Sequence, residues 1–167
     1  MIFLVLTLVL SCTRQNGYDA EGDFETALMA DGKSVEIIGY TGSKWAVRIP
    51  PQIRKLPVAR IGEGAFENKK ISSVAIPNTV ASIGAMAFSK NHLTEITIPD
   101  SVTKIEYYAF IDNQLFSMTL PANVDMGVYV FSFHPEFKDI YEKEGRRAVT
   151  FFIDDDEKIW KAKYYKE

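Results

Sequence analysis

The sequence predicts a solenoid, a fold in which short units stack along one axis and share a continuous core. The main observation is that identical residue types recur at a step of 22 residues in several registers at once. The recurring positions hold aromatic, aliphatic and proline residues: Phe66, Phe88 and Phe110; Ile61, Ile83 and Ile105; Pro77, Pro99 and Pro121; Val58, Val80, Val102 and Val124; Ile71, Leu93 and Leu115. Several registers that share one period indicate stacked structural repeats. A solenoid of so few turns offers a surface rather than a closed cleft. We therefore expect a binding function rather than a catalytic one.

The composition supports one globular domain. The chain has 167 residues, of which 47% are hydrophobic and 25% charged, and this argues against disorder. The formal net charge of -3 is small, and no arginine-rich stripe, zinc spacing or phosphate-binding loop is present. We therefore expect no nucleic-acid partner and no cofactor.

Residues 1–11 are interpreted as an export signal. Met1 to Leu10 is almost wholly apolar, but it is too short to span a bilayer, which takes about 20 residues. The run ends in Val9-Leu10-Ser11-Cys12, which resembles the lipobox of bacterial lipoproteins, where the cysteine thiol carries the lipid. Cys12 is the single cysteine, so no internal disulfide can form. The alternative is a plain secretory signal that ends near a cysteine.

Residues 12–23 are predicted to be the lipidated cysteine followed by a polar, flexible tether. Residues 24–57 are predicted to form an N-terminal β cap, because a solenoid needs its first apolar cross-section covered. Alternating residues on both sides of Asp31-Gly32 predict a β-hairpin with a type I′ turn.

A further strand is expected at Trp45 to Ile49, where Pro50 ends it. This strand matches the repeat positions of Val74 and Ile76, and residues 52–56 then form an insertion of five residues.

Residues 58–134 hold the repeats, and three of them are complete: Val58–Thr79, Val80–Ser101 and Val102–Asn123. In the middle repeat, residues 93–98 are the expected strand, with Ile96 facing inward and Thr97 outward. The segment Ile83 to Phe88 is expected to return along the opposite face as a tight turn or short helical piece. The phenylalanines should stack into one column.

The repeats resemble those of BspA-like, or treponemal-type, bacterial leucine-rich-repeat proteins. The quoted elements are the Ile-Gly-x-x-Ala-Phe cores, the Ile-Pro strand endings and the opening segment: residues 61–66 and 83–88, residues 76–77 and 98–99, and residues 38–42. The likeness covers about residues 24 to 165. Two departures are Glu106 in place of the glycine and a final half-turn (Val124 to Phe131) that is one residue short.

The resemblance implies a leucine-rich-repeat solenoid of the α/β-type horseshoe class, with short parallel strands and an irregular convex side. It also implies a non-catalytic lipoprotein of the bacterial cell envelope, lipid-anchored at the outer membrane or cell surface. Such a protein would adhere to host matrix proteins such as fibronectin or fibrinogen, or to other bacteria. We expect a monomer.

Residues 135–167 are predicted to close the other end as a helix-hairpin cap. A helix is expected from His134 to Gly145, with Pro135 in its first turn and Gly145 at the C′ position. Alternating apolar residues around 149–153 and 160–164 predict a hairpin.

Catalytic chemistry has little support in the sequence. His92 occupies a repeat position held elsewhere by Lys70 and Gln114, which is typical of a variable surface. His134 is interpreted as a helix cap, and no serine lies in a nucleophile-elbow motif. The acidic segment 154–157 is either a cation site or, as we favour, a solvated hairpin loop. The nearby lysines are expected either to contact anionic lipid or glycan or, as we favour, to line the polar face of the last hairpin: Lys158, Lys161, Lys163 and Lys166.

The predicted binding face is the outward side of the parallel strands. Its candidate residues are short, polar or aromatic: Ser73, Ala75, Glu95, Thr97, Phe116, Ser117 and Thr119. Such a wide, shallow face suits a protein partner, although it is also what a merely solvated scaffold would present. The first hypothesis is an adhesive surface lipoprotein, and the alternative is a periplasmic structural or assembly lipoprotein. A third hypothesis, an enzyme, would require paired carboxylates in a cleft.

Overall fold

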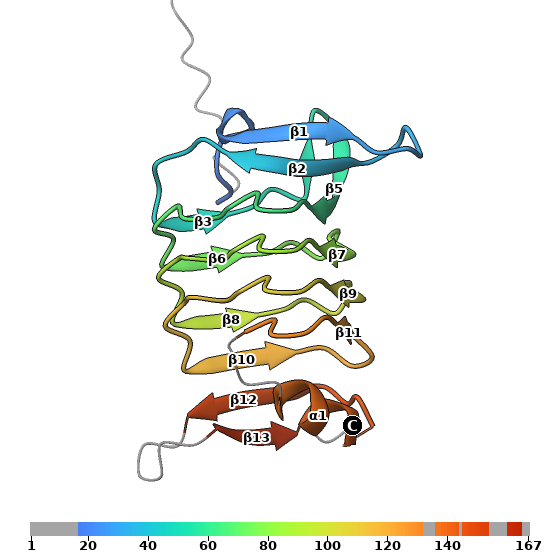
Figure 1. Cartoon of the computed structure of the whole chain (residues 1–167). Coiled ribbons are helices and arrows are strands. Elements are labelled where there is room, and N and C mark those ends of the chain that lie inside the picture. The colour runs from blue at the N-terminus through green and yellow to red at the C-terminus, as the bar shows by residue number, and fades with distance from the viewer. Residues whose placement is uncertain (1–16, 132–135, 144, 154–159, 165–167) are drawn as a thin grey trace, which may run out of the picture.

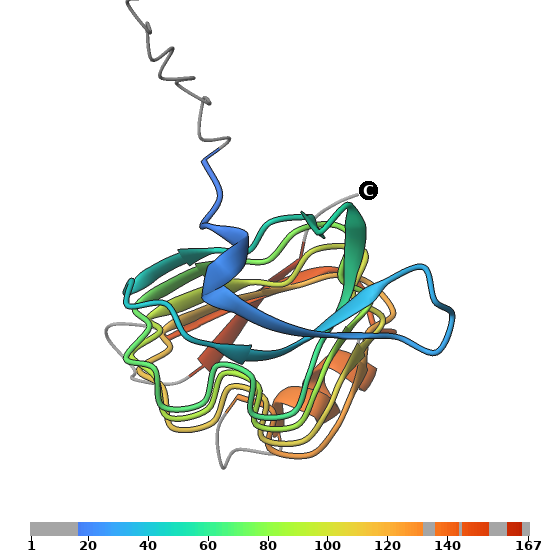
Figure 2. The same cartoon turned by 90° about the horizontal axis from the view of Figure 1, so that it is seen from above.

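The computed structural model describes residues 17–131, 136–143, 145–153 and 160–164. The chain winds into a straight stack of flat turns (Figure 1). Seen along the stack axis, successive turns lie over one another (Figure 2). The sequence repeat is therefore also the structural repeat, and the predicted solenoid class is confirmed. The predicted export signal and Cys12 lie outside the described residues.

A β-hairpin lies at the N-terminal end of the stack. After a short 3-10 turn, η1 (Glu21–Asp23), strand β1 (Phe24–Leu28) pairs antiparallel with β2 (Val35–Tyr40). Strand β2 then pairs in parallel with β5 (Leu56–Ile61), the first strand of the repeats on that side. The hairpin thus satisfies a sheet edge that would otherwise present unpaired backbone groups.

The predicted type I′ turn at Asp31-Gly32 is wrong. Only Gly32 has a positive φ there, at 63°, whereas a type I′ turn needs two such residues. The Asp31 side chain instead organises a longer loop, since its Oδ1 accepts hydrogen bonds from the backbone N–H groups of Lys33 and Ser34 at 2.8 and 3.1 Å. Aspartate competes in this way for nearby backbone donors.

Two adjacent left-handed residues do occur, but inside the five-residue insertion. Arg54 and Lys55 have φ values of 52° and 66°. They join β4 (Gln52–Ile53) to β5, and the register pairs Ile53 with Leu56. The insertion is therefore a tight hairpin, which neither residue type indicated because arginine and lysine are not typical turn residues.

The predicted strands of the repeats are confirmed on one side of each turn. They are β3 (Ala46–Arg48), β6 (Ser73–Ala75), β8 (Glu95–Thr97) and β10 (Ser117–Leu120). Strand β3 pairs in parallel with β6, and β8 pairs in parallel with β10. Ile96 is buried and Thr97 is exposed, so the predicted facing of the middle repeat holds.

A second parallel ladder runs along another side of the stack. It continues from β5 through β7 (Ser82–Ile83), β9 (Lys104–Ile105) and β11 (Asp125–Met126). The predicted tight turn in the segment Ile83 to Phe88 is found at residues 85–88, whereas Ile83 itself belongs to β7. The ladder escaped sequence analysis because two residues a turn are too few to show an alternating pattern.

The phenylalanine column forms the centre of the core, as predicted. The ring centroids of Phe66 and Phe88 are 4.9 Å apart, and those of Phe88 and Phe110 are 5.2 Å apart. Phe131 continues the column at 5.4 Å from Phe110, and Tyr40 of the hairpin stacks on Phe66 at 5.3 Å. The column therefore ties the N-terminal hairpin and the final half-turn to the repeats.

Two asparagines form a second, polar column that sequence analysis did not identify. The buried Asn91 side-chain amide donates hydrogen bonds to the carbonyls of Phe66, Phe88 and Ser89, and its oxygen accepts from Lys69 and Ile71. Asn113 repeats most of this pattern one turn later. Buried backbone groups need hydrogen-bond partners, and these asparagine side chains supply them to the N–H and carbonyl groups at one corner of each turn.

Glu106 occupies the repeat position that Gly84 holds one turn earlier. A side chain at the preceding glycine, Gly84, would place a Cβ atom 2.8 Å from the backbone of the previous turn. The Glu106 side chain is accommodated, and its carboxylate contacts residues of the neighbouring turns and of β9. Its Oε2 accepts a hydrogen bond from the Ala85 N–H at 3.2 Å, and its Oε1 pairs with Arg60 at 3.3 Å and Lys104 at 3.4 Å.

A helix and two antiparallel strands follow the repeats. Helix α1 spans Glu136–Lys143. Gly145 follows it with a φ of 72°, and the N–H groups of Gly145 and Arg146 donate to the carbonyls of Glu142 and Tyr141. This is the expected glycine C-cap. The expected N-terminal part of the helix, His134 and Pro135, lies outside the described residues.

Strand β12 (Val149–Ile153) pairs antiparallel with β10, and β13 (Trp160–Tyr164) pairs antiparallel with β12. Both strands were predicted. Helix α1 is fastened to the last repeat by the Tyr141 hydroxyl, which donates to the Pro121 carbonyl at 2.6 Å and accepts from the Val124 N–H at 3.0 Å.

Candidate protein-binding face

The strand face consists of the outward side chains of β3, β6, β8 and β10. The parallel register places Glu95 beside Ser117 and Thr97 beside Thr119, so the face consists of rows along the stack axis. The structure therefore brings most of the predicted site residues together. Phe116 precedes β10 and is 52% exposed at the start of the strand.

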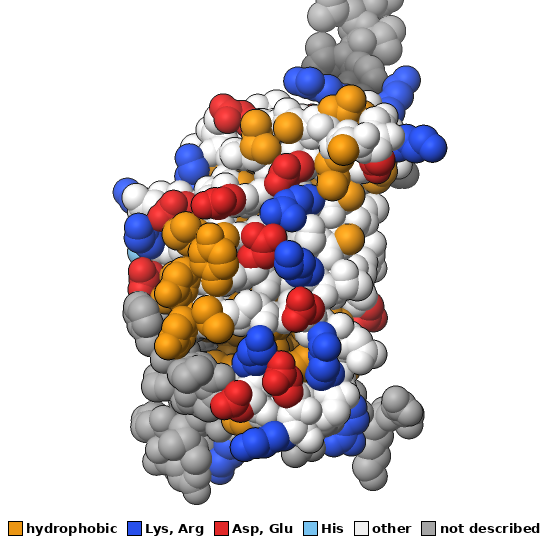
Figure 3. Space-filling model, turned by 45° about the vertical axis from the view of Figure 1, so that its right-hand side comes forward, with side chains coloured by type: hydrophobic (Ala, Val, Ile, Leu, Met, Phe, Trp, Pro, Cys, Tyr) orange, Lys and Arg blue, Asp and Glu red, His pale blue; other side chains and the backbone are white. Residues whose placement is uncertain are grey.

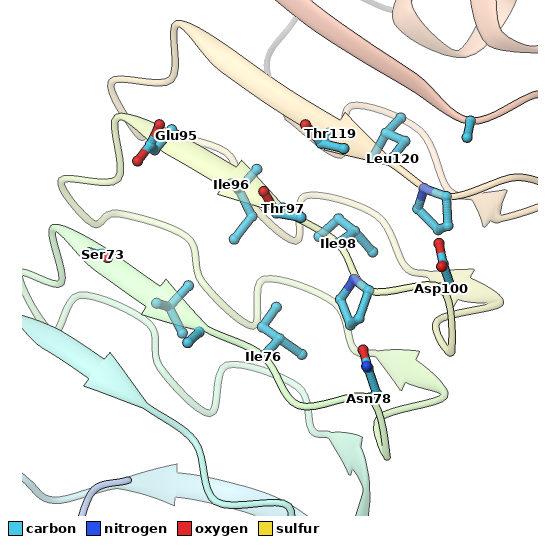
Figure 4. Close-up of a pocket in the computed structure, with 15 residues that line it drawn as sticks. Ser73, Ile76, Asn78, Glu95, Ile96, Thr97, Ile98, Asp100, Thr119 and Leu120 are labelled. Atoms are coloured by element: carbon cyan, nitrogen blue, oxygen red, sulfur yellow. The ribbon is translucent and has the colours of Figure 1, made fainter. Parts of the chain in front are cut away.

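The main hollow of this face lies over β6, β8 and β10 and has a volume of about 590 Å³ (Figure 4). Five of the seven predicted residues line it: Ser73, Ala75, Glu95, Thr97 and Thr119. Phe116 and Ser117 are not in its lining. The predicted face is thus partly hollowed rather than flat.

Two polar residues in this lining were not identified from the sequence. Asn78 and Asp100 follow Pro77 and Pro99, at the corner where each strand ends, and both line the hollow. Their signal was present, since they share the repeat step of 22 residues directly after the proline. The lining holds two carboxylates, Glu95 and Asp100, and no lysine, arginine or histidine.

Strands β12 and β13 enlarge the strand face at its C-terminal end. The hydroxyls of Thr119 and Thr150 lie 2.8 Å apart, and Phe152 stands opposite Ser117. On β13, Lys161 pairs with Phe152 and Lys163 with Thr150, which places both lysines on the same side as the predicted site. Lys158, Lys166 and the acidic segment 154–157 lie outside the described residues.

A separate apolar patch lies on the side of the turns that follow β7, β9 and β11 (Figure 3). Met86, Tyr108 and Tyr129 occupy the repeat position of Gly64 and, like it, have positive φ values. The rings of Tyr108 and Tyr129 stack at 5.9 Å, and Tyr107 is 44% exposed. These residues were not predicted as a site, because the repeat position they share changes from glycine to methionine and then to tyrosine along the stack.

The histidines and acidic residues of the described part of the chain do not gather into a metal site. Within residues 17–131, 136–143, 145–153 and 160–164, no group of three histidine, cysteine or acidic side chains could hold a metal ion. The same part of the chain contains no helix long and apolar enough to cross a membrane. His92 is exposed, with its Nδ1 3.4 Å from Gln114 Nε2, so it belongs to a surface row as expected. His134 lies outside the described residues.

A comparison with models of protein families shows which family the repeats belong to. A model of the BspA type leucine-rich repeat region, comprising six copies, matches residues 59–149. The chain belongs to the BspA-type leucine-rich repeat family. No curated protein matches the sequence.

Three solved structures illustrate how the family resembles this chain. A leucine-rich repeat protein of T. pallidum is 27% identical, with a TM-score of 0.60 over 69% of this chain and 56% of that chain. A leucine-rich cell surface protein of Faecalibacterium prausnitzii is 32% identical, with a TM-score of 0.57 over 65% and 32%. A leucine-rich repeat protein of Bacteroides ovatus is 30% identical, with a TM-score of 0.57 over 66% and 31%.

This chain therefore spans between about a third and just over half of the length of these relatives.

Proposed function

We propose that this protein is a non-catalytic interaction protein of the bacterial cell envelope that binds a protein partner through its strand face. The observation that carries the proposal is the hollow over β6, β8 and β10, which combines exposed polar side chains with apolar ones along the strands of successive turns. Solenoids use such extended faces to hold partners.

The proposed biological role is adhesion to host matrix proteins or to other cells. The apolar run of residues 1–10 and the lipobox-like Val9-Leu10-Ser11-Cys12 support export and a lipid anchor. The F. prausnitzii relative is described as a cell surface protein, which supports a surface location for this chain as well. Lipid on Cys12 would hold the domain at a membrane, since several buried acyl chains bind lastingly whereas one does not.

The binding experiment uses the full chain against immobilised fibronectin and fibrinogen. We expect saturable binding that Thr97→Lys weakens, because Thr97 is exposed on the strand face and a lysine there would obstruct the hollow. Thr103→Lys is the matched control, since Thr103 is equally exposed but lies between β8 and β9, outside the hollow. Absence of saturable binding, or equal losses for both variants, would refute adhesion through this face.

The location is tested on intact cells. Protease added outside should remove the domain if it is at the surface, whereas protection would favour the periplasmic alternative. Labelling with a radioactive fatty acid should mark the wild-type protein and not Cys12→Ser. Label on both proteins, or on neither, would rule out lipidation at Cys12.

A further inference from the structure

The apolar patch beside the turns that follow β7, β9 and β11 is distinct from the strand face (Figure 3). We call it the tyrosine patch, and its members are the apolar residues of successive turns: Met86, Tyr107, Tyr108, Ile111, Val128 and Tyr129. The first repeat carries Glu63 and Gly64 where the third carries Tyr107 and Tyr108, so the patch belongs to one part of the stack only. Exposed apolar patches mark interaction sites.

A hollow of about 220 Å³ opens in the tyrosine patch. Its apolar walls are Met86 of the second repeat and Tyr108 and Ile111 of the third. Ser89, which also lines the hollow, occupies the repeat position of Glu67 and Ile111 and is the smallest of the three side chains. The hollow therefore lies where the serine leaves side-chain volume unfilled.

The Ser89 hydroxyl gives a second, independent indication of a ligand. Ser89 is 1% exposed, and its Oγ has no hydrogen-bond partner within the part of the chain that the structure describes. Leaving a buried hydroxyl without a partner costs about 1–3 kcal/mol. A polar atom of a ligand that enters the hollow can supply this partner.

The rim of the hollow carries charges of both signs. Lys90 Nζ lies 2.9 Å from Glu67 Oε1, and the hydrogen bond and charge of Glu67, followed by the charge of Asp112, raise the pKa of Lys90. Asp112 has no ion pair of its own among the described residues. The rim thus offers two carboxylates that accept hydrogen bonds and one ammonium group that donates them.

The size of the site argues for a small ligand. A stable protein–protein interface takes about 20–30 residues on each side, whereas the tyrosine patch has six. Its hollow of about 220 Å³ is smaller than the roughly 300–1,000 Å³ of sites for drug-sized molecules. It therefore suits a single ring.

The lining then selects among small ligands. An acyl chain would leave the charged groups and the Ser89 hydroxyl without partners, and an anion would meet two carboxylates for one ammonium group. The hydroxyls of a neutral sugar both donate and accept, so they can bond to Asp112, Lys90 and Ser89. Its C–H face is apolar and can pack on a tyrosine ring, whose π face is negative.

From the hollow, the unpartnered hydroxyl and the mixed rim we infer that the tyrosine patch binds a neutral sugar ring of a glycan. The ring packs between Met86 and Tyr108 and bonds to Ser89 and Asp112. Tyr129 of the following turn supports Tyr108, since the two rings stack at 5.9 Å with planes 8° apart. This site goes beyond the proposed function, because it shares no residue with the hollow of the strand face.

The experiment applies the full chain to immobilised neutral, sialylated and sulfated oligosaccharides. We expect saturable binding to at least one neutral oligosaccharide, with an affinity that added salt leaves unchanged, because the ligand carries no charge to be screened. In solution, NMR saturation of the protein's aromatic protons should pass to the C–H protons of that sugar.

Two variants test the residues. Ser89→Ile should weaken binding at least about tenfold, because it fills the hollow and removes the hydroxyl, and Ile111 shows that isoleucine is accepted at this repeat position. Asp112→Asn should weaken binding about fivefold, because an amide forms weaker hydrogen bonds than a carboxylate. Asp125→Asn is the matched control, since Asp125 is an exposed carboxylate of β11 outside the hollow.

Thermal unfolding shows whether each variant is folded, and Asp112→Asn carries the test if Ser89→Ile is not. The inference is wrong if no oligosaccharide binds, if only sialylated or sulfated ones bind, or if Asp112→Asn binds as tightly as Asp125→Asn. None of these results affects the proposed function, which Thr97→Lys tests separately on matrix proteins.

Discussion

Phe88 is the residue on which the core depends most directly. Its side chain is fully buried and stacks between Phe66 and Phe110 at 4.9 and 5.2 Å. Phe88→Ala would leave a cavity that the rigid turns above and below cannot close, so we expect a loss of about 3–5 kcal/mol in the free energy of unfolding. Denaturant titration measures this loss.

Thr97→Ala provides the comparison within the same repeat. Thr97 is exposed on β8, so its truncation should change the free energy of unfolding by less than about 0.5 kcal/mol. Equal losses for Phe88→Ala and Thr97→Ala would contradict the assignment of inward and outward faces.

Glu106 should make stability depend on pH. Burial alone would raise the pKa of its carboxyl group, but the charge of Arg60, the bond from Lys104 and the Ala85 N–H together hold the pKa below its ordinary value of 4.5. Because the folded-state pKa is the lower one, the ionised carboxylate stabilises the fold above about pH 4.5, and this contribution is lost as the pH falls through the folded-state pKa.

The measurement is the difference in unfolding free energy between wild type and Glu106→Gln across pH. We expect wild type to be more stable at neutral pH and the difference to shrink in acid. A difference that stayed constant with pH would show that the ion pairs with Arg60 and Lys104 contribute nothing to stability.

Two turns contain residues with positive φ, and substitutions there should change the free energy of unfolding in opposite directions. Lys55 has a φ of 66° in the tight turn between β4 and β5, a conformation that costs an ordinary side chain about 1–2 kcal/mol and glycine almost nothing. Lys55→Gly should therefore raise the free energy of unfolding by about 0.5–1 kcal/mol, after the greater unfolded-state freedom of glycine is subtracted.

Gly32→Ala is the converse test in the hairpin loop. Gly32 has a φ of 63°, and a Cβ atom there would meet no neighbour within 4 Å. Any loss of stability must then come from the backbone, and we expect about 1 kcal/mol. If thermal unfolding showed both variants shifted in the same direction, left-handed strain would not be the cause.

Sequence patterns predicted the elements whose side chains repeat and missed those held by local geometry. The phenylalanine column and the facing of Ile96 follow from a step of 22 residues, because an identical side chain at each turn stacks on itself. The turn at Arg54 and Lys55 has no such signal, since tertiary packing imposes a conformation that neither residue favours. Asn91 and Asn113 do keep the step, but their role is visible only through the carbonyls that they bind.

The candidate site was predictable to a similar degree. Alternation within the strands placed Glu95 and Thr97 on the outer face, and the structure agrees. The lack of pairing between β6 and β8 was not predictable, because both strands keep the same repeat positions. Hydrogen bonds between neighbouring turns depend on spacings well below 1 Å, which residue types do not encode.

At the scale of the whole molecule, the C-terminal elements should decide whether the stack is soluble. Strand β12 covers the edge of β10, and Val149 and Phe151 are buried against the last repeat. A chain ending at residue 131 would expose that edge and the apolar side chains beneath it. We expect this truncated chain to lose cooperative unfolding or to self-associate, because terminal repeats of solenoids need a polar covering.

A point substitution in the full-length chain tests the attachment of helix α1 to the last repeat without removing any residues. Tyr141→Phe keeps every residue but removes the hydroxyl that bonds to the Pro121 carbonyl and the Val124 N–H. Two buried backbone groups would then lack a partner, and we expect a loss of about 1–3 kcal/mol in unfolding free energy with no self-association. Sedimentation and calorimetry follow both properties. A truncated chain that stayed monomeric and unfolded like wild type, together with a neutral Tyr141→Phe, would show that the repeats fold without their C-terminal covering.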